Sequence, residues 1–301
     1  MKPPRIVQVL LGVVILCAYA GSVLGADASG GGANAGAQPA SASAALEPAP
    51  DRLIFRPYIA DPRTPHFSGA WHFYAGDKEL RNVGSANFGE TFVTLPRPAA
   101  FDGVWQLGLQ PAVFAIFDMD AASSDLINAD YLIGVPVFYR KDDLAIRGRL
   151  FHQSSHLGDE YLLREKHEDY ANLSYEAVDI QLSYFLSESF RVYGGGGYIV
   201  RRDPSGIEPW FTQGGVEFTQ DMGFKLWNQG VSYVFAADAQ NEQETRWRTN
   251  LSLRTGLQLE PAAGRTAKWQ LLVEYYNGYS PNGLFYDRVI EYHGLGLHYY
   301  F

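Results

Sequence analysis

The feature that most constrains the fold is a series of short alternating segments that fills the chain from His66 to Phe301. Within each segment apolar and polar residues alternate at every second position, and turn residues separate one segment from the next. The longer segments have roughly ten to fourteen residues, as strands that cross a membrane require. The pattern predicts an all-β fold, a transmembrane antiparallel β-barrel of about 12 strands, over residues 66–74, 87–95, 104–119, 129–140, 144–157, 171–186, 190–201, 210–219, 227–237, 249–259, 267–276 and 289–301.

The first 25 residues are typical of a secretory signal peptide. Two basic residues, Lys2 and Arg5, precede an apolar run that ends at Leu16, and small residues follow, so that cleavage after Gly25 fits best. The single cysteine, Cys17, lies inside this signal behind a bulky leucine, where a lipoprotein signal needs a small residue. We therefore expect a mature chain with no disulfide, no thiolate nucleophile and no lipid anchor.

Residues 26–50 consist mainly of Ala, Gly, Ser and Pro, which cannot bury enough apolar surface to order themselves, and are expected to form a disordered linker. Residues 51–65 are rich in proline and predict a periplasmic segment or one that folds back as a plug. The barrel would then occupy residues 66–301. No later stretch is apolar for 18 residues, which excludes helical membrane spans, and the net charge of -9 argues against nucleic acid as a partner.

The connections between segments suggest an orientation. An even number of strands places both ends of the barrel in the periplasm, where short turns are found. The tight turns at 141–143 and 187–189 alternate with longer connections at 159–170 and 279–288, which we expect outside. The last segment puts Leu295, Leu297, Tyr299 and Phe301 on one face, and a terminal Phe resembles the signal by which the barrel assembly machinery recognises outer-membrane proteins. The expected location is the bacterial outer membrane.

The segment 144–157 carries an unusual set of polar residues. Because side chains alternate across a strand, Arg147, Arg149, Phe151, Gln153 and Ser155 share one face, and the other face holds Ile146, Leu150, His152, Ser154 and His156. The second set begins apolar, and the apolar face of a membrane barrel meets lipid. We therefore expect His152, Ser154 and His156 to point outward.

The next segment repeats this pattern from the opposite direction. Its lipid-facing row is Val178, Ile180, Leu182, Tyr184 and Leu186, and traced back toward the loop this row becomes Asn172, Ser174 and Glu176. A hairpin centred near Arg164 would pair Glu176 with His152, Ser174 with Ser154, and Asn172 with His156.

Polar groups on a lipid face are costly, so a cluster of them indicates a function. A serine, a histidine two residues away and a Glu or Asn that orients the histidine make the arrangement that acyl transfer needs. Ser154 would attack a lipid ester, His152 would act as general base, and Asn172 or Glu176 would orient His152. The expected substrates are lipopolysaccharide or phospholipid of the outer leaflet. Asp159 and Glu160 could recruit a calcium ion, since hard cations favour carboxylate oxygens.

The stretches FHQSSHLGDE and NLSYE, with the twelve-segment plan, resemble a family of uncharacterised bacterial outer-membrane proteins known only as a domain of unknown function, over the whole mature chain. The His-x-Ser pair also resembles, locally, outer-membrane phospholipase A and the lipid A deacylases, whose barrels carry this pair facing outward and an orienting Asn or Glu on the next strand. That resemblance implies an acyl hydrolase. Both enzyme families have Asn directly after the serine, whereas this chain has Ser155, and its connecting loop is longer.

Other interpretations stay open from sequence alone. The polar cluster could be a rim where the strand leaves the hydrocarbon zone, or it could line the lumen if the two faces are inverted. The chain could be a narrow channel or a non-catalytic structural or interaction barrel, because twelve strands lie between the packed eight-stranded and open sixteen-stranded cases. Lumenal Arg147, Arg149 and Asp179 could fill such a barrel by pairing. A calcium-dependent or homodimeric form is also left open.

Overall fold

The computed structural model describes residues 47–48, 53–76, 79–165, 173–261 and 267–301. The expected signal peptide, almost all of the expected linker and the candidate Asn172 lie outside these residues. Among the described residues, no helix has the length and apolar character needed to cross a membrane.

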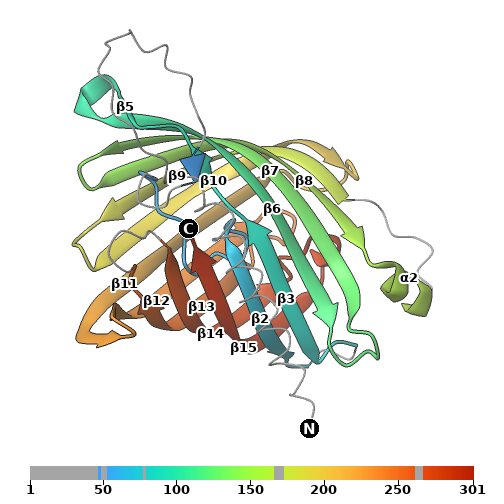
Figure 1. Cartoon of the computed structure of the whole chain (residues 1–301). Helices are drawn as coiled ribbons and strands as arrows, with labels where there is room; N and C mark the ends of the chain where they lie inside the picture. Colours follow the sequence, from blue (N-terminus) through green and yellow to red (C-terminus); the bar gives the residue numbers. More distant parts are fainter. Residues whose placement is uncertain (1–46, 49–52, 77–78, 166–172, 262–266) are drawn as a thin grey trace, which may run out of the picture.

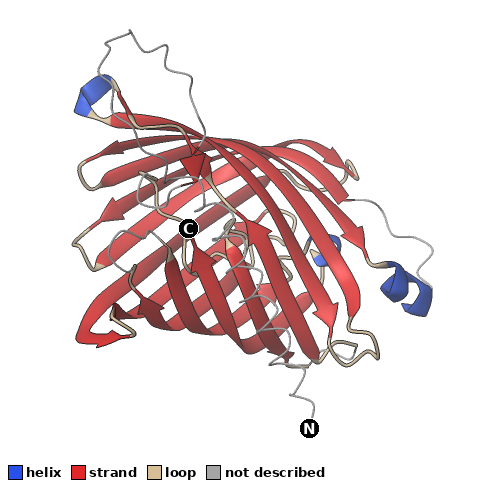
Figure 2. Ribbon diagram, in the orientation of Figure 1, coloured by secondary structure: helices blue, strands red, loops and turns tan. Residues whose placement is uncertain are grey.

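Twelve antiparallel strands close into a barrel, as predicted (Figures 1 and 2). Each strand pairs with the next along the chain, and the last closes on the first through the pairing of Leu297 with Gly69. The strands are β2 (Phe67–Tyr74), β3 (Asn82–Gly89), β6 (Val104–Asp118), β7 (Asp125–Lys141), β8 (Leu144–Leu157), β9 (Leu173–Phe185), β10 (Phe190–Asp203), β11 (Trp210–Leu226), β12 (Gln229–Glu242), β13 (Thr249–Leu259), β14 (Lys268–Tyr279) and β15 (Val289–Tyr300).

In the part of the chain that the structure describes, three two-residue strands and three short helical turns lie outside this ring. The strand β1 (Glu47–Pro48) pairs with β4 (Phe92–Val93), and both β4 and β5 (Arg97–Pro98) pair with β6. The connections between strands hold the helices η2 (Ala100–Asp102), α2 (Asp159–Glu165) and η3 (Gly283–Phe285).

Several predicted strands differ in extent from the observed ones, and two of them differ most. The second was expected over 87–95, but β3 begins at Asn82, because residues 82–89 complete the pairing with β6 up to Asp118. The strand expected to end at residue 219 continues to Leu226. The polar residues Gln220 and Asp221 stay paired with β12, and the chain then bulges before Lys225.

The connections sort onto two ends of the barrel. The tight turns after β7 and β9, at 142–143 and 186–189, lie at the same end as the C-terminal residue, which we call the turn end. Asp142 takes a left-handed conformation with φ 51° in the first of these turns. The connections that hold α2 and η3 lie at the opposite end, called the loop end. The four connections named from the sequence therefore alternate as predicted, but the turn end also carries the long connection 90–103, which holds β4, β5 and η2.

The outer wall is apolar and the lumen is polar. Outward residues such as Leu150, Val178 and Ile180 are 55%, 43% and 60% exposed, whereas their inward neighbours are buried. The predicted lumenal pairing is present: Asp179 accepts from the Arg149 Nε at 2.8 Å and lies 3.3 Å from the Arg147 guanidinium. This distribution leaves hydrocarbon-compatible surface only on the outside.

Residues 53–66, which we call the lumen segment, run inside the barrel without regular secondary structure. The Tyr58 ring is 1% exposed and stacks on Tyr193 of β10 with ring centroids 3.7 Å apart. The Ile59 N–H donates to Glu217 at 2.7 Å, and the Arg63 guanidinium pairs with buried Asp130 at 2.9 Å. Because wall side chains satisfy its backbone groups, the segment can remain buried without strand partners.

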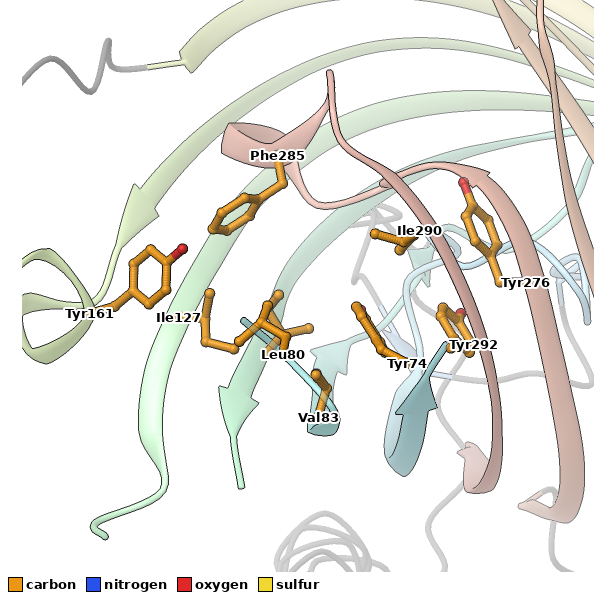
Figure 3. Close-up of a cluster of buried hydrophobic side chains, with 10 residues drawn as sticks. Tyr74, Leu80, Val83, Ile127, Tyr161, Tyr276, Phe285, Ile290 and Tyr292 are labelled. Atoms are coloured by element: carbon orange, nitrogen blue, oxygen red, sulfur yellow. The ribbon is translucent and has the colours of Figure 1, made fainter. Parts of the chain in front are cut away.

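A hydrophobic cap closes one side of the loop end (Figure 3). The fully buried Tyr161 of α2 meets Phe285 of η3 edge-on, with ring centroids 5.8 Å apart. The cap ties both loop-end helices to the strands, and its buried members are Tyr74, Leu80, Val83, Ile116, Ile127, Tyr161, Tyr276, Phe285, Ile290 and Tyr292.

Candidate active site on the outer wall

The hairpin of β8 and β9 pairs the residues that the alternation predicted. His152 lies opposite Glu176 and Ser154 opposite Ser174 in the register. The His152 Nδ1 lies 3.1 Å from the Glu176 Oε1, and the two side chains are 39% and 32% exposed. A carboxylate on Nδ1 fixes the ring orientation and leaves Nε2 to face a hydroxyl, as the base of a hydrolytic triad requires.

Ser154 is partly buried and lies on the same outward face as His152, two positions further along β8. Two positions on a strand span about 7 Å, a separation that a histidine side chain can bridge. His156 comes next on this face; it is exposed and packs edge-on against Tyr131, with ring centroids 5.7 Å apart. The expected pairing of His156 with Asn172 falls outside the described residues.

Arg201 also lies at the candidate site, although the alternation of residues did not predict it. A bulge in β10 between Ile199 and Arg201 brings Arg201 opposite Glu176. Its guanidinium lies 3.6 Å from the Glu176 Oε1, and its side chain is 83% exposed. The extra residue of the bulge breaks the period of two, so counting positions along the strand could not have found this contact.

The position of the site relative to the hydrocarbon can be judged from the next row of outward residues toward the turn end. Leu150, Val178, Tyr198 and Trp210 are neighbours across four strands and all face outward. Aromatic residues of membrane barrels gather at the boundary between hydrocarbon and head groups. The pair of His152 and Glu176 lies two positions beyond this row, or about 7 Å toward the loop end.

The two carboxylates proposed for calcium lie on the first turn of α2, next to the site in the chain. Asp159 and Glu160 are both exposed. Among the described residues there is no group of three or more His, Cys, Asp or Glu side chains that could hold a metal ion. These two carboxylates alone do not make a calcium site, because such an ion takes six to eight oxygen ligands.

A closed antiparallel barrel with an apolar wall and an ion-paired lumen defines an outer-membrane β-barrel. The structure of outer membrane phospholipase A from Escherichia coli is similar, with a TM-score of 0.52 and 13% sequence identity over 78% of this chain and 90% of that chain. The Salmonella typhi outer membrane phospholipase, a dimer with bound calcium, has a TM-score of 0.52 and 12% identity over 78% of this chain and 91% of its own.

The chain belongs to the family described as protein of unknown function DUF1207, whose profile matches residues 34–301. No curated protein matches the sequence. The predicted resemblances to an uncharacterised outer-membrane family and to phospholipase A barrels are therefore confirmed. At 12–13% identity the similarity to the phospholipases shows the fold alone.

Proposed function

We propose that this protein is an outer-membrane lipid acyl-ester hydrolase that acts on the outer leaflet through Ser154 and His152. The observation that carries the proposal is the contact between the His152 Nδ1 and the Glu176 Oε1 at 3.1 Å, on the lipid-facing side of the barrel. An exposed ion pair gains little stability, so stability alone gives little reason for charged groups next to the apolar outward pair of Leu150 and Val178. A hydrolytic site would explain why His152 and Glu176 are found there.

The proposed reaction uses only groups of this chain and a water molecule. Ser154 Oγ attacks the ester carbonyl while His152 Nε2 takes its proton, and His152 then gives that proton to the departing alcohol. Water, deprotonated by His152, cleaves the acyl-serine and restores both residues. Glu176 holds the imidazole and stabilises its protonated form, and Asn172 is the alternative for this role. No step depends on Asp159 or Glu160.

The depth of the site favours a lipid ester. If the tight turns lie in the periplasm, the loop end lies outside, and His152 lies two positions beyond Leu150 in that direction. The row of Leu150 includes Tyr198 and Trp210, and such aromatic residues are typical of the edge of the hydrocarbon. Ester groups of membrane lipids lie at this boundary. Arg201 lies on the same face beside Glu176, and its guanidinium is exposed enough to meet a phosphate as well. Phospholipid and lipid A both carry ester and phosphate groups.

The direct test is lipid hydrolysis by purified, refolded barrel in mixed micelles that contain phospholipid or lipid A, with and without calcium. Wild-type protein should release fatty acid, and Ser154→Ala should release none above background. Ser174→Ala is the matched control, because Ser174 lies directly opposite Ser154 without a role in the reaction. Equal background release from all three proteins would leave the cluster as a polar rim.

A further inference from the structure

The lumen segment separates two cavities inside the barrel. A cavity of about 450 Å³ lies toward the turn end and is bounded by Arg56, Pro57 and Ile59 of this segment. A second cavity of about 180 Å³ lies toward the loop end and is bounded by Asp61 and Arg63. The same short stretch therefore forms the wall between a space that opens toward one end and a space that opens toward the other.

The segment is held in place by contacts to its backbone. Arg191 donates to the carbonyl oxygens of Arg56 and Pro57, both at 2.8 Å, and Arg254 donates to the carbonyl of Ile59 at 2.7 Å. These bonds recognise a peptide chain rather than particular side chains.

The wall groups that hold the segment keep other partners of their own. The Arg191 Nε donates to Glu217 at 2.8 Å, and the Arg254 Nε lies 3.0 Å from Glu274. Asp130, which pairs with Arg63, also accepts from Asn128 at 2.9 Å. Departure of the segment would therefore leave Arg191 and Arg254 paired with carboxylates, and would leave Asp130 with hydrogen bonds from Asn128 and the Gly283 N–H but without its cation. Water can replace the lost backbone bonds and solvate this carboxylate once the lumen opens.

The aromatic anchors favour the closed state. Phe55 is 3% exposed and Tyr58 1% exposed, and both pack on lumenal aromatic rings. The Tyr58 hydroxyl is buried without a hydrogen-bond partner among the described residues. Burial of this polar group costs free energy and weakens the binding of the segment. The segment is thus bound as a ligand is bound, by two apolar anchors and a set of polar contacts.

We propose that the barrel is a latent channel for small water-soluble ions, which residues 53–66 close and which opens when this segment leaves the lumen. Twelve strands enclose more space than a packed eight-stranded barrel. Pro57 and Ile59 line the first cavity and Asp61 and Arg63 line the second, so removal of this stretch should join them. This activity is independent of lipid hydrolysis, because the ion path lies inside the wall and Ser154 lies outside it.

The test is single-channel recording in planar bilayers with KCl as the probe. Full-length protein should give rare or no openings, and a variant that lacks residues 53–65 should give long-lived conductance steps in most recordings. Heat-modifiable mobility on gels verifies that the variant forms a barrel. A folded deletion variant that conducts no more than wild type would overturn the proposal, as would wild-type protein that conducts as much as the deletion.

A second pair of variants tests the proposal even if the deletion variant does not form a barrel. Tyr58→Ala removes the aromatic anchor of the segment that stacks on Tyr193 and leaves the wall unchanged, so it should raise the opening frequency at least tenfold. Gln270→Ala, which removes a lumenal bond to Gln258 only, should not. A short thiol crosslinker between Asp61→Cys and Gln240→Cys, whose parent side chains are 3.1 Å apart, should abolish the openings of Tyr58→Ala until it is reduced. If the crosslink did not affect the openings, residues 53–66 would not be the segment that closes the channel.

Discussion

His152 on β8 and Glu176 on β9 lie directly opposite each other on the outer wall of the barrel and form an ion-pair contact of 3.1 Å. Toward the turn end the wall is apolar, with Leu150 and Val178 as the next outward pair, and toward the loop end the next pair is Ser154 and Ser174. A histidine whose Nδ1 is held by a carboxylate, on the same face as a serine, is the arrangement on which the proposed hydrolysis depends.

The identity of the residue that orients His152 can be decided by mutation. Glu176→Gln should lower kcat by about 10²-fold or more, because the neutral amide no longer stabilises the imidazolium. Asn172→Ala should then have a small effect. Steady-state hydrolysis of a micellar ester measures both. Full activity in Glu176→Gln together with loss in Asn172→Ala would reverse the two roles.

Arg201 should affect the binding of substrate rather than the chemistry. We expect Arg201→Gln to raise KM for phosphate-bearing lipids by roughly threefold to tenfold, with kcat nearly unchanged, because a charge-assisted contact at an exposed position is modest. An uncharged diacylglycerol should show no such change. Arg202→Gln is the matched control, since Arg202 donates to the Ser205 carbonyl instead. A loss confined to kcat would argue against a binding role.

Glu90 makes barrel stability depend on pH. Burial raises the pKa of this carboxyl from its ordinary value to about 7, in the connection between β3 and β4. The folded state then holds a proton that the unfolded state releases, so stability should fall as pH rises from about 4.5 to about 7. Glu90→Gln should remove this fall, which is on the order of 1–3 kcal/mol. Urea midpoints at pH 5 and pH 8 measure it, with Glu188→Gln as the control from the same cavity.

Glu274 is the centre of the lumenal charge network. Its carboxylate lies 2.6 Å from the His72 Nε2, 2.8 Å from the His298 Nε2 and 3.0 Å from the Arg254 Nε. The last two are ion-pair distances with poor hydrogen-bond angles. Glu274→Gln leaves the buried Arg254 charge uncompensated and should destabilise the barrel by about 3–5 kcal/mol in urea titrations. The exposed Glu291→Gln on β15 should change stability by less than about 0.5 kcal/mol.

Tyr161 should control the order of α2. Tyr161→Ala removes a fully buried ring from the cap and leaves a cavity against Phe285, at a cost of about 3–5 kcal/mol to the docking of α2. Trypsin should then cleave faster after Arg164, while the heat-modifiable mobility of the barrel persists. Leu163→Ala, on the exposed side of the same helix, should leave the cleavage rate unchanged. Equal rates in both variants would show that the cap does not hold α2.

The period of two along the chain was sufficient to predict much of this structure. A strand in a membrane barrel must present alternate residues to lipid and to the lumen, so the pattern alone specified the strands, their faces and the outward position of His152 and Ser154. A hairpin centred near Arg164 then fixed the register, and the predicted pairing of His152 with Glu176 is the observed one.

The remaining features were decided by tertiary structure, because they join residues that no local period relates. Arg201 reaches Glu176 only because a bulge shifts the register of β10. The lumen segment lacks a strand pattern and is held by partners far along the chain, as in the pairs of Arg63 with Asp130 and Arg254 with Ile59. Such contacts depend on how the closed wall brings inward side chains together. Sequence alone therefore determined the barrel and the face of the candidate site, and folding decided what fills the lumen.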